Sequence, residues 1–162
     1  MRTPAGLRPG MRVLEIGAGT GQIAVTLAKH LGVSVVTLEI WESLKPIQDY
    51  AMEQGVVNDV LAIKMNAESL QFAEESFDTV FGIGSFFMIE NRKEAMKEMS
   101  RVTRKAGRIG IAEPMCTTNS IPDELKKYEL LGSYKKWLRS LEWNCKLFYG
   151  HGLRVFESFY FS

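Results

Sequence analysis

The sequence predicts a doubly wound α/β fold, in which helices cover both faces of a mostly parallel sheet. Strand-like runs rich in β-branched residues alternate along the chain with segments of helical periodicity. This alternation is typical of parallel strands joined by crossover helices. The first strand-like run ends in three alternating glycines, Gly17, Gly19 and Gly21, and an amphipathic helix follows at once. That order is typical of the first unit of such a fold.

The elements follow from the same patterns. Strands are expected at about 11–16, 33–39, 60–65, 78–84, 107–112 and 152–160. Helices are expected at about 21–31, 44–55 and 91–103, and in one or two pieces between 122 and 144.

Glycine and proline positions support several of these boundaries. Gly32 and Gly55 stand where the first two helices should end, because glycine readily adopts the left-handed conformation of a helix C-cap. Pro46 is compatible with the second helix only in its first turn. The run 105–107 is expected to be a turn that leads into the fifth strand.

Bulk properties indicate one ordinary globular domain over residues 1–162. The hydrophobic fraction is 46%, and 20 basic residues nearly balance 19 acidic ones, for a net charge of +1. This charge gives no reason to expect nucleic acid or an anionic membrane as a partner. No run approaches the roughly 18 apolar residues of a membrane span, and Met1–Pro4 does not open a signal peptide. Cys116 and Cys145 form no metal-binding pair, so we expect no metal and a cytoplasmic location.

The glycine-rich turn predicts a cradle for a nucleotide-like ligand. Glycine lets the backbone turn sharply and approach a ligand, and the following helix offers unpaired N–H groups. In dinucleotide-binding oxidoreductases this turn has the sequence motif G-x-G-x-x-G. Here the pattern is G-x-G-x-G, and Gln22 stands where the third dinucleotide glycine would be. The spacing therefore disfavours an oxidoreductase.

Ligands of doubly wound sheets bind beyond the carboxyl ends of the strands. Glu39 stands at the end of the second strand, where its carboxylate can accept hydrogen bonds from two ribose hydroxyls. The alternative is an acid that simply faces solvent at a strand end. The preceding glycine motif favours the ligand contact.

Several motifs in order resemble class I S-adenosylmethionine-dependent methyltransferases. The run 13–22 resembles their motif I, and 66–78 resembles the stretch written G-D-A-x-x-L-P-F…S-F-D. The run 94–111 resembles the segment E-x-x-R-V-L-K-P-G-G that enters the fifth strand. The resemblance covers about residues 7–113 and is strongest to the ubiquinone/menaquinone-biosynthesis-like (methyltransferase type 11) group.

The resemblance implies a Rossmann-like methyltransferase fold, S-adenosylmethionine as cofactor, S-adenosylhomocysteine as product, and methyl transfer to a small-molecule acceptor by in-line displacement. Asn66 stands where the family has an acidic residue that hydrogen-bonds the edge of the adenine base. The neutral amide of Asn66 should bind the adenine less tightly than a carboxylate would. The cofactor-binding residues that the resemblance implies are Glu15, Gly17, Ala18, Gly19, Thr20, Gly21, Glu39, Ile40, Asn66, Ala67, Glu68, Ser85 and Phe86.

No catalytic residue can be assigned from the sequence. A general base is needed only if the acceptor must lose a proton. Glu90, Glu113 and His151 are candidates, and each has a purely structural alternative as a loop or strand-end residue. The acceptor itself cannot be read from the sequence.

The two ends of the chain depart from the family pattern. Only twelve residues precede Val13, where the family usually has a further helix that covers the cofactor. The family's sheet has seven strands, and after the run 152–160 no residues remain for the seventh, antiparallel strand. We therefore expect a truncated domain whose unpaired sheet edge could support a homodimer. The alternative function is a catalytically silent methyltransferase-like domain that binds the cofactor or a partner chain.

Overall fold

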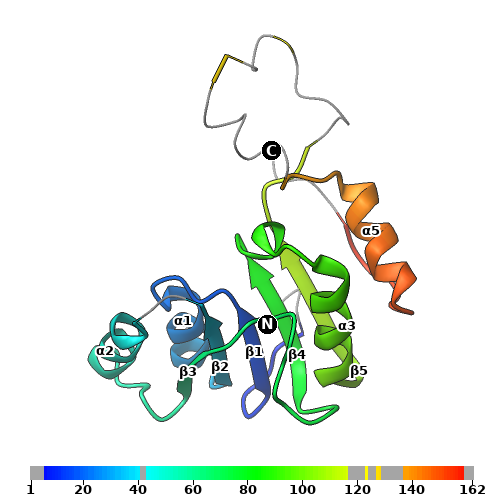
Figure 1. Ribbon diagram of the computed structural model, residues 1–162. Helices are drawn as coiled ribbons and strands as arrows, with labels where there is room; N and C mark the ends of the chain where they lie inside the picture. The colour runs from blue at the N-terminus through cyan, green and yellow to red at the C-terminus, as the bar shows by residue number, and fades with distance from the viewer. Residues whose placement is uncertain (1–5, 41–42, 117–122, 124–126, 129–136, 159–162) are drawn as a thin grey trace.

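A parallel five-stranded sheet forms the centre of the computed structural model, which describes residues 6–40, 43–116, 123, 127–128 and 137–158 (Figure 1). The strand order is β3-β2-β1-β4-β5, and every adjacent pair is parallel. The strands are β1 (Arg12–Ile16), β2 (Ser34–Glu39), β3 (Val60–Lys64), β4 (Phe77–Ile83) and β5 (Thr103–Ala112). The predicted doubly wound fold is confirmed, and the first four strands begin and end within one residue of their expected bounds.

Helices cover both faces of this sheet. They are α1 (Gln22–Leu31), α2 (Lys45–Glu53), the short 3-10 helix η1 (Phe86–Met88), α3 (Arg92–Val102) and α5 (Leu141–Gly150). Neighbouring strand residues point to opposite faces, so Val13 packs in the core cluster under α1 and α2, whereas Leu14 packs in the cluster under α3 and α5. Among the described helices, none is long and apolar enough to cross a membrane.

The helix boundaries follow the predicted glycine and proline chemistry. Gly32 caps α1 with a φ of 63°, and Pro46 lies in the first turn of α2. The C-cap of α2 is Gln54, one residue before the predicted Gly55, which adopts the left-handed conformation just beyond it with a φ of 74°.

Strand β5 begins earlier than predicted. The helix α3 ends at Val102 and the chain passes directly into the strand at Thr103, which pairs with Phe77. The next paired residue is Arg108, opposite Thr79, so residues 104–107 form an irregularity inside the strand. The predicted turn at 105–107 is therefore a bulge, in which Ala106 has a φ of 59°.

The strand predicted at 152–160 is not present over its described part, residues 152–158, and 159–160 lie outside the described residues. Leu153 packs against the core, and Phe156 lies near the guanidinium groups of Arg108 and Arg154. Side-chain contacts thus hold this segment where a backbone ladder was expected. The helical pieces predicted between 122 and 144 fall mostly outside the described residues, and α5 runs six residues past them.

Candidate functional site

The glycine turn after β1 lies at the carboxyl edge of the sheet, and its glycines are required for different reasons. Gly17 has a φ of 82°, and a Cβ there would lie 2.3 Å from the Cβ of Ser85. Gly19 has a φ of 52°, but a Cβ there would meet nothing within 4 Å. Packing therefore excludes a side chain at Gly17. At Gly19 the left-handed backbone conformation alone favours glycine, because the space beside this residue is open.

The Glu39 carboxylate at the end of β2 holds this turn. Its Oε2 accepts a hydrogen bond from the backbone N–H of Gly19 at 2.8 Å, and its Oε1 accepts one from that of Ile40, also at 2.8 Å. Glu39 is only 6% exposed. A carboxylate offers about four lone-pair positions, so two hydrogen bonds leave it able to accept from ligand hydroxyls.

Glu15 lies buried beneath the turn. Its Oε2 accepts a hydrogen bond from the Thr37 hydroxyl at 2.5 Å, on the neighbouring strand β2. Burial raises the pKa of Glu15 from 4.5 to about 7, and the nearby Glu39 carboxylate adds to that increase, whereas the Thr37 hydrogen bond opposes it. The group can thus change its charge near neutral pH, close to the Glu39 carboxylate.

The loop after β3 is fixed by its own polar side chains. The Oδ1 of Asn66 accepts a hydrogen bond from the backbone N–H of Glu68 at 2.9 Å. The Oε1 of Glu68 in turn accepts one from the backbone of Asn91 at 3.0 Å. Asn66 is exposed and Ala67 is buried. Asn66 therefore faces outward with one lone pair of its side-chain oxygen still available.

The loop after β4 contacts the turn through Ser85. The Ser85 hydroxyl donates to the carbonyl oxygen of Ile16 at 2.5 Å. Phe86, expected at the site together with Ser85, is fully buried and packs in the core under α3. The side chains of Phe86 and Phe87 are both buried in η1. Phe86 is therefore a core residue in this structure, although the sequence placed it at the cofactor site.

Hydrogen bonds join the four loops that follow β1, β2, β3 and β4. Besides the Glu39 and Ser85 contacts, the backbone N–H groups of Gly17 and Ala18 donate to the carbonyl of Leu38 at 2.9 and 2.8 Å. The backbone N–H of Met65 donates to the carbonyl of Glu39 at 3.2 Å. The remaining predicted residues complete this edge, with Thr20 exposed and Gly21 at the N-cap of α1.

The three candidate bases lie in different surroundings. Glu90 is exposed. Both ring nitrogens of His151 face carbonyl oxygens, of Leu147 at 2.8 Å and of Lys93 at 3.1 Å, so the ring ties α5 to α3. Glu113 is half-buried, and burial raises the pKa of its carboxyl. Among the described residues, no group of three His, Cys, Asp or Glu is placed to hold a metal ion.

Sequence reasoning missed two buried polar residues beside Glu113. Arg92, at the start of α3, is 6% exposed, and Asn144, in α5, is 3% exposed. The Nδ2 of Asn144 donates to the Oε1 of Glu113 at 3.1 Å. No local motif marks these residues, because the contact joins elements far apart in the chain.

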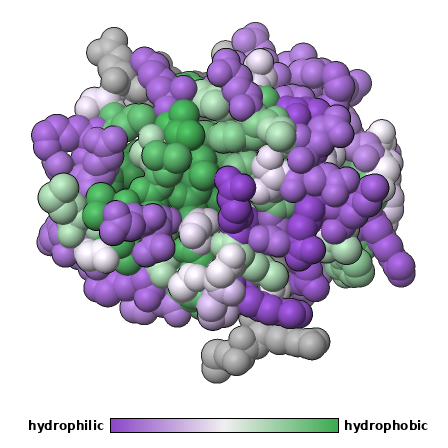
Figure 2. Space-filling model, turned by 90° about the horizontal axis from the view of Figure 1, so that it is seen from below, coloured by the Kyte–Doolittle hydropathy of each residue, from purple (hydrophilic) through white to green (hydrophobic). Residues whose placement is uncertain are grey.

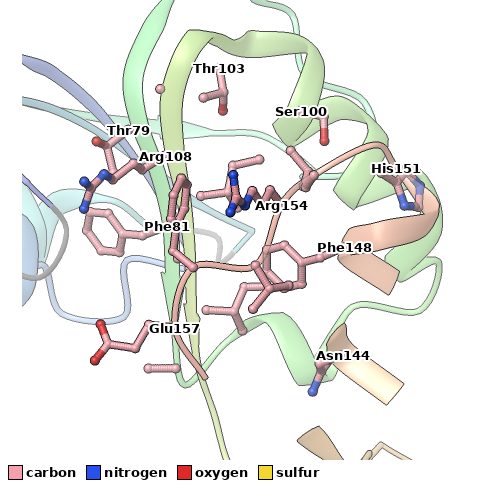
Figure 3. Close-up of a pocket in the computed structure, with 18 of the residues that line it drawn as sticks. Thr79, Phe81, Ser100, Thr103, Arg108, Asn144, Phe148, His151, Arg154 and Glu157 are labelled. Carbon is pink, nitrogen blue, oxygen red and sulfur yellow. The ribbon is translucent and has the colours of Figure 1, made fainter. Parts of the chain in front are cut away.

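A hollow of about 1260 Å³ runs along β5, away from the glycine turn. Figure 3 shows Phe81 and Arg108 of the sheet on one side of it, and Asn144, Phe148 and His151 of α5 on the other. Its lining includes Glu113 but not the glycine turn, Glu39 or Asn66. The hollow and the turn are thus separate features of the fold.

Comparison with known proteins identifies the class. The profile of the methyltransferase domain family matches residues 14–111, more than half of the chain. The ubiquinone/menaquinone biosynthesis C-methyltransferase UbiE of Burkholderia orbicola is 33% identical over 142 residues, which cover 83% of this chain and 55% of the relative.

Solved structures support the same fold. The YcgJ protein of Bacillus subtilis matches with a TM-score of 0.79 and 23% identity, over 91% of this chain and 63% of that one. Phosphoethanolamine N-methyltransferase 2 of Haemonchus contortus, in complex with S-adenosyl-L-methionine, has a TM-score of 0.79 and 20% identity, over 90% of this chain and 34% of that one.

This chain belongs to the class I S-adenosylmethionine-dependent methyltransferases, in the group that resembles UbiE. It spans only about 38–55% of the length of the curated relatives it matches.

Proposed function

We propose that this chain binds S-adenosylmethionine at the glycine turn and transfers its methyl group to a small-molecule acceptor. The observation that carries the proposal is the hydrogen bond from the Gly19 N–H to the Glu39 carboxylate, which brings the two most diagnostic parts of the site together. The open space beside Gly19 and the spare lone pairs of Glu39 fit a nucleoside with two ribose hydroxyls.

The charges of the site also fit this cofactor. The bound cofactor supplies a methyl group already activated by a sulfonium cation, so the protein needs mainly to align the reactants and exclude water. The buried carboxylate of Glu39 places negative charge at the turn, which favours a cationic ligand. Ser85 fixes the neighbouring loop against the turn through its bond to Ile16.

Calorimetric titration with S-adenosylhomocysteine tests cofactor binding, with NAD and ATP as comparison ligands. We expect the thioether alone to bind. Glu39→Ala should weaken it at least about tenfold, because two charge-assisted hydrogen bonds to the ribose are lost. Glu53→Ala, at the exposed end of α2, is the matched control and should leave the affinity unchanged. Binding of NAD in preference to the thioether would refute the proposal.

Methyl transfer itself is tested with S-adenosylmethionine labelled on the methyl group and a panel of small-molecule acceptors. Label in an acceptor supports the enzyme. Cofactor binding without transfer to any acceptor would instead support the catalytically silent domain.

We further propose that two copies of the chain can pair along the outer edge of β5. This strand ends the described sheet, and unpaired edges favour association. Figure 2 shows an apolar area bordered by polar side chains on the face seen from below the sheet, and such areas often bind other surfaces. Sedimentation over a range of concentrations tests this, and a monomer at the highest concentration would refute it.

A further inference from the structure

The short helix η1 follows β4 and cannot satisfy all of its own backbone groups. Two hydrogen bonds close it, from the N–H of Met88 to the carbonyl of Ser85 and from the N–H of Ile89 to the carbonyl of Phe86, both at 3.1 Å. Neither bond involves Phe87, the middle residue, which is only 7% exposed. Buried backbone groups nearly always have a hydrogen-bond partner, so groups from outside η1 must hold Phe87.

Two charged side chains hold the Phe87 backbone. The Nη2 of Arg92, at the start of α3, donates to the carbonyl oxygen of Phe87 at 2.7 Å. The carboxylate of Glu113, just after β5, accepts a hydrogen bond from the N–H of the same residue. Charged groups form stronger hydrogen bonds than neutral ones. The position of η1 is therefore set from α3 and from the end of β5 together.

The same two side chains also bind α5 and the segment that leads into it. The Nδ2 of Asn144, in α5, donates to the Oε1 of Glu113 at 3.1 Å. The Nη2 of Arg92 donates to the carbonyl oxygen of Trp137, and its guanidinium lies 5.3 Å from the centre of the Trp143 ring. Each charged side chain thus joins η1 to the α5 region.

The other end of η1 contacts the glycine turn. Ser85, the N-cap of η1, donates its hydroxyl hydrogen to the carbonyl oxygen of Ile16 at 2.5 Å. Its Cβ packs so closely on Gly17 that a Cβ there would lie only 2.3 Å away. A shift of η1 would therefore be passed to the turn. One path of contacts links α5 to this turn, through Asn144, Glu113, Phe87, Ser85 and Ile16.

The cluster of Arg92, Glu113 and Asn144 is better suited to fixing a position than to adding stability. Among the described residues, Nη1 of Arg92, Oε2 of Glu113 and Oδ1 of Asn144 have no hydrogen-bond partner. Burying such groups costs free energy that an apolar cluster of the same volume would not cost. What the cluster supplies instead is direction, because its hydrogen bonds fix how the Phe87 backbone is oriented.

We propose that Arg92, Glu113 and Asn144 are positioning residues, which hold η1 and, through Ser85, the glycine turn in the conformation that binds the cofactor. The inference rests on the proposed function for the identity of that ligand, whereas the path from α5 to Ile16 lies within the chain. Coupling between the two ends of such a path is reciprocal, so cofactor binding at the turn also acts on Asn144.

The carbonyl-carbon resonance of Ile16 tests the path without any ligand, in nuclear magnetic resonance spectra of the full chain. Ser85→Ala removes the hydrogen bond to Ile16 and gives the reference displacement. Glu113→Met removes the acceptor of the Phe87 N–H and should displace the resonance in the same direction. Glu113→Gln keeps a carbonyl oxygen and should restore the wild-type position. Glu53→Met, at the exposed end of α2, is the matched control and should leave the resonance in place.

A double-mutant cycle in the affinity for S-adenosylhomocysteine tests the effect on the cofactor. Ser85→Ala and Glu113→Met should each weaken binding about three- to tenfold. The double variant should bind no more weakly than the weaker of the two single variants, because both substitutions break the same path. In the wild-type chain, the ligand should also shift the side-chain amide resonances of Asn144.

Asn144→Leu is a second variant, which breaks only the α5 end of the path. It should displace the Ile16 resonance in the same direction, because Glu113 loses the neutral donor that orients it. This variant gives both readings if Glu113→Met does not fold.

The outcomes separate this inference from the proposed function. An Ile16 resonance that stays in place in Glu113→Met and Asn144→Leu overturns the inference. Displacements that are equal in Glu113→Gln and Glu113→Met overturn it too, as do losses of affinity that multiply in the double variant. Failure of S-adenosylhomocysteine to bind the wild type refutes the proposed function instead, and the Ile16 resonance still decides whether the cluster positions the turn.

Discussion

Substituting Gly17 by alanine should destabilise the fold far more than the same substitution two residues later. The left-handed conformation at a φ of 82° costs an alanine about 1–2 kcal/mol. The new Cβ would lie 2.3 Å from the Cβ of Ser85, so that loop must move, at a cost of about 1–3 kcal/mol. Moving Ser85 also breaks its hydrogen bond to Ile16, worth about 1 kcal/mol. We expect Gly17→Ala to lower the free energy of unfolding by about 3–6 kcal/mol.

Gly19→Ala is the matched comparison within the same turn. It carries the conformational cost alone, about 1–2 kcal/mol, because its Cβ meets nothing within 4 Å. That Cβ would, however, occupy the space assigned to the cofactor, so S-adenosylhomocysteine binding should weaken at least about tenfold. Urea unfolding followed by circular dichroism gives the two free energies, and calorimetry gives the affinity. The reasoning is refuted if the two variants lose equal stability, or if Gly19→Ala binds like the wild type.

Three further predictions concern stability and affinity. Because the pKa of Glu15 rises from 4.5 to about 7 on folding, the folded chain keeps a proton that the unfolded chain releases. The free energy of unfolding of the wild type should therefore fall by about 3 kcal/mol relative to that of Glu15→Gln as the pH rises from 4.5 to 7. Urea unfolding at a series of pH values measures both free energies, and parallel pH profiles would contradict this prediction. Asn66→Asp restores a charged acceptor and should tighten S-adenosylhomocysteine binding about three- to tenfold by calorimetry, and an unchanged affinity would show that this side chain does not contact the base. Arg101→Met removes bonds to the carbonyls of Phe72 and Leu70 and should lower the free energy of unfolding by about 2 kcal/mol, whereas the exposed Lys97→Met should not.

The geometry of the glycine turn and of the helix ends could be predicted from the sequence because its determinants are local. The G-x-G-x-G turn needs left-handed residues next to a helix N-cap, and glycine alone marks such positions clearly. Glu39 follows a strand whose parallel pairing with β1 carries it to the same edge. The caps at Gly32 and Pro46 are likewise set by the residue's own backbone preferences.

The errors lie where long-range contacts override local pattern. The irregularity at 104–107 depends on Thr103 pairing with Phe77, which no local preference shows. The alternating pattern at 152–158 indicates a strand, but the segment forms no ladder: Leu153 packs against the core, whereas Phe156 is 81% exposed. Arg92 and Asn144 were missed because they reach Glu113 only through tertiary contacts, and hydrophobic periodicity carries no signal for such polar clusters.

The bond between Glu39 and Gly19 bears on how tightly a cofactor can be held. Without that bond, a turn of glycines would sample many conformations, and a ligand would have to order it on binding. Glu39 instead fixes the Gly19 N–H from the next strand, and the carbonyl of Leu38 fixes the N–H groups of Gly17 and Ala18. The turn is therefore preorganised by β2 before any ligand arrives, so more of the interaction energy appears as affinity. In the proposed site, Glu39 would therefore contribute to cofactor affinity in two ways, through its own free lone pairs and through the shape that it imposes on the turn. We expect the loss of affinity in Glu39→Ala to exceed the contribution of the ribose contacts alone.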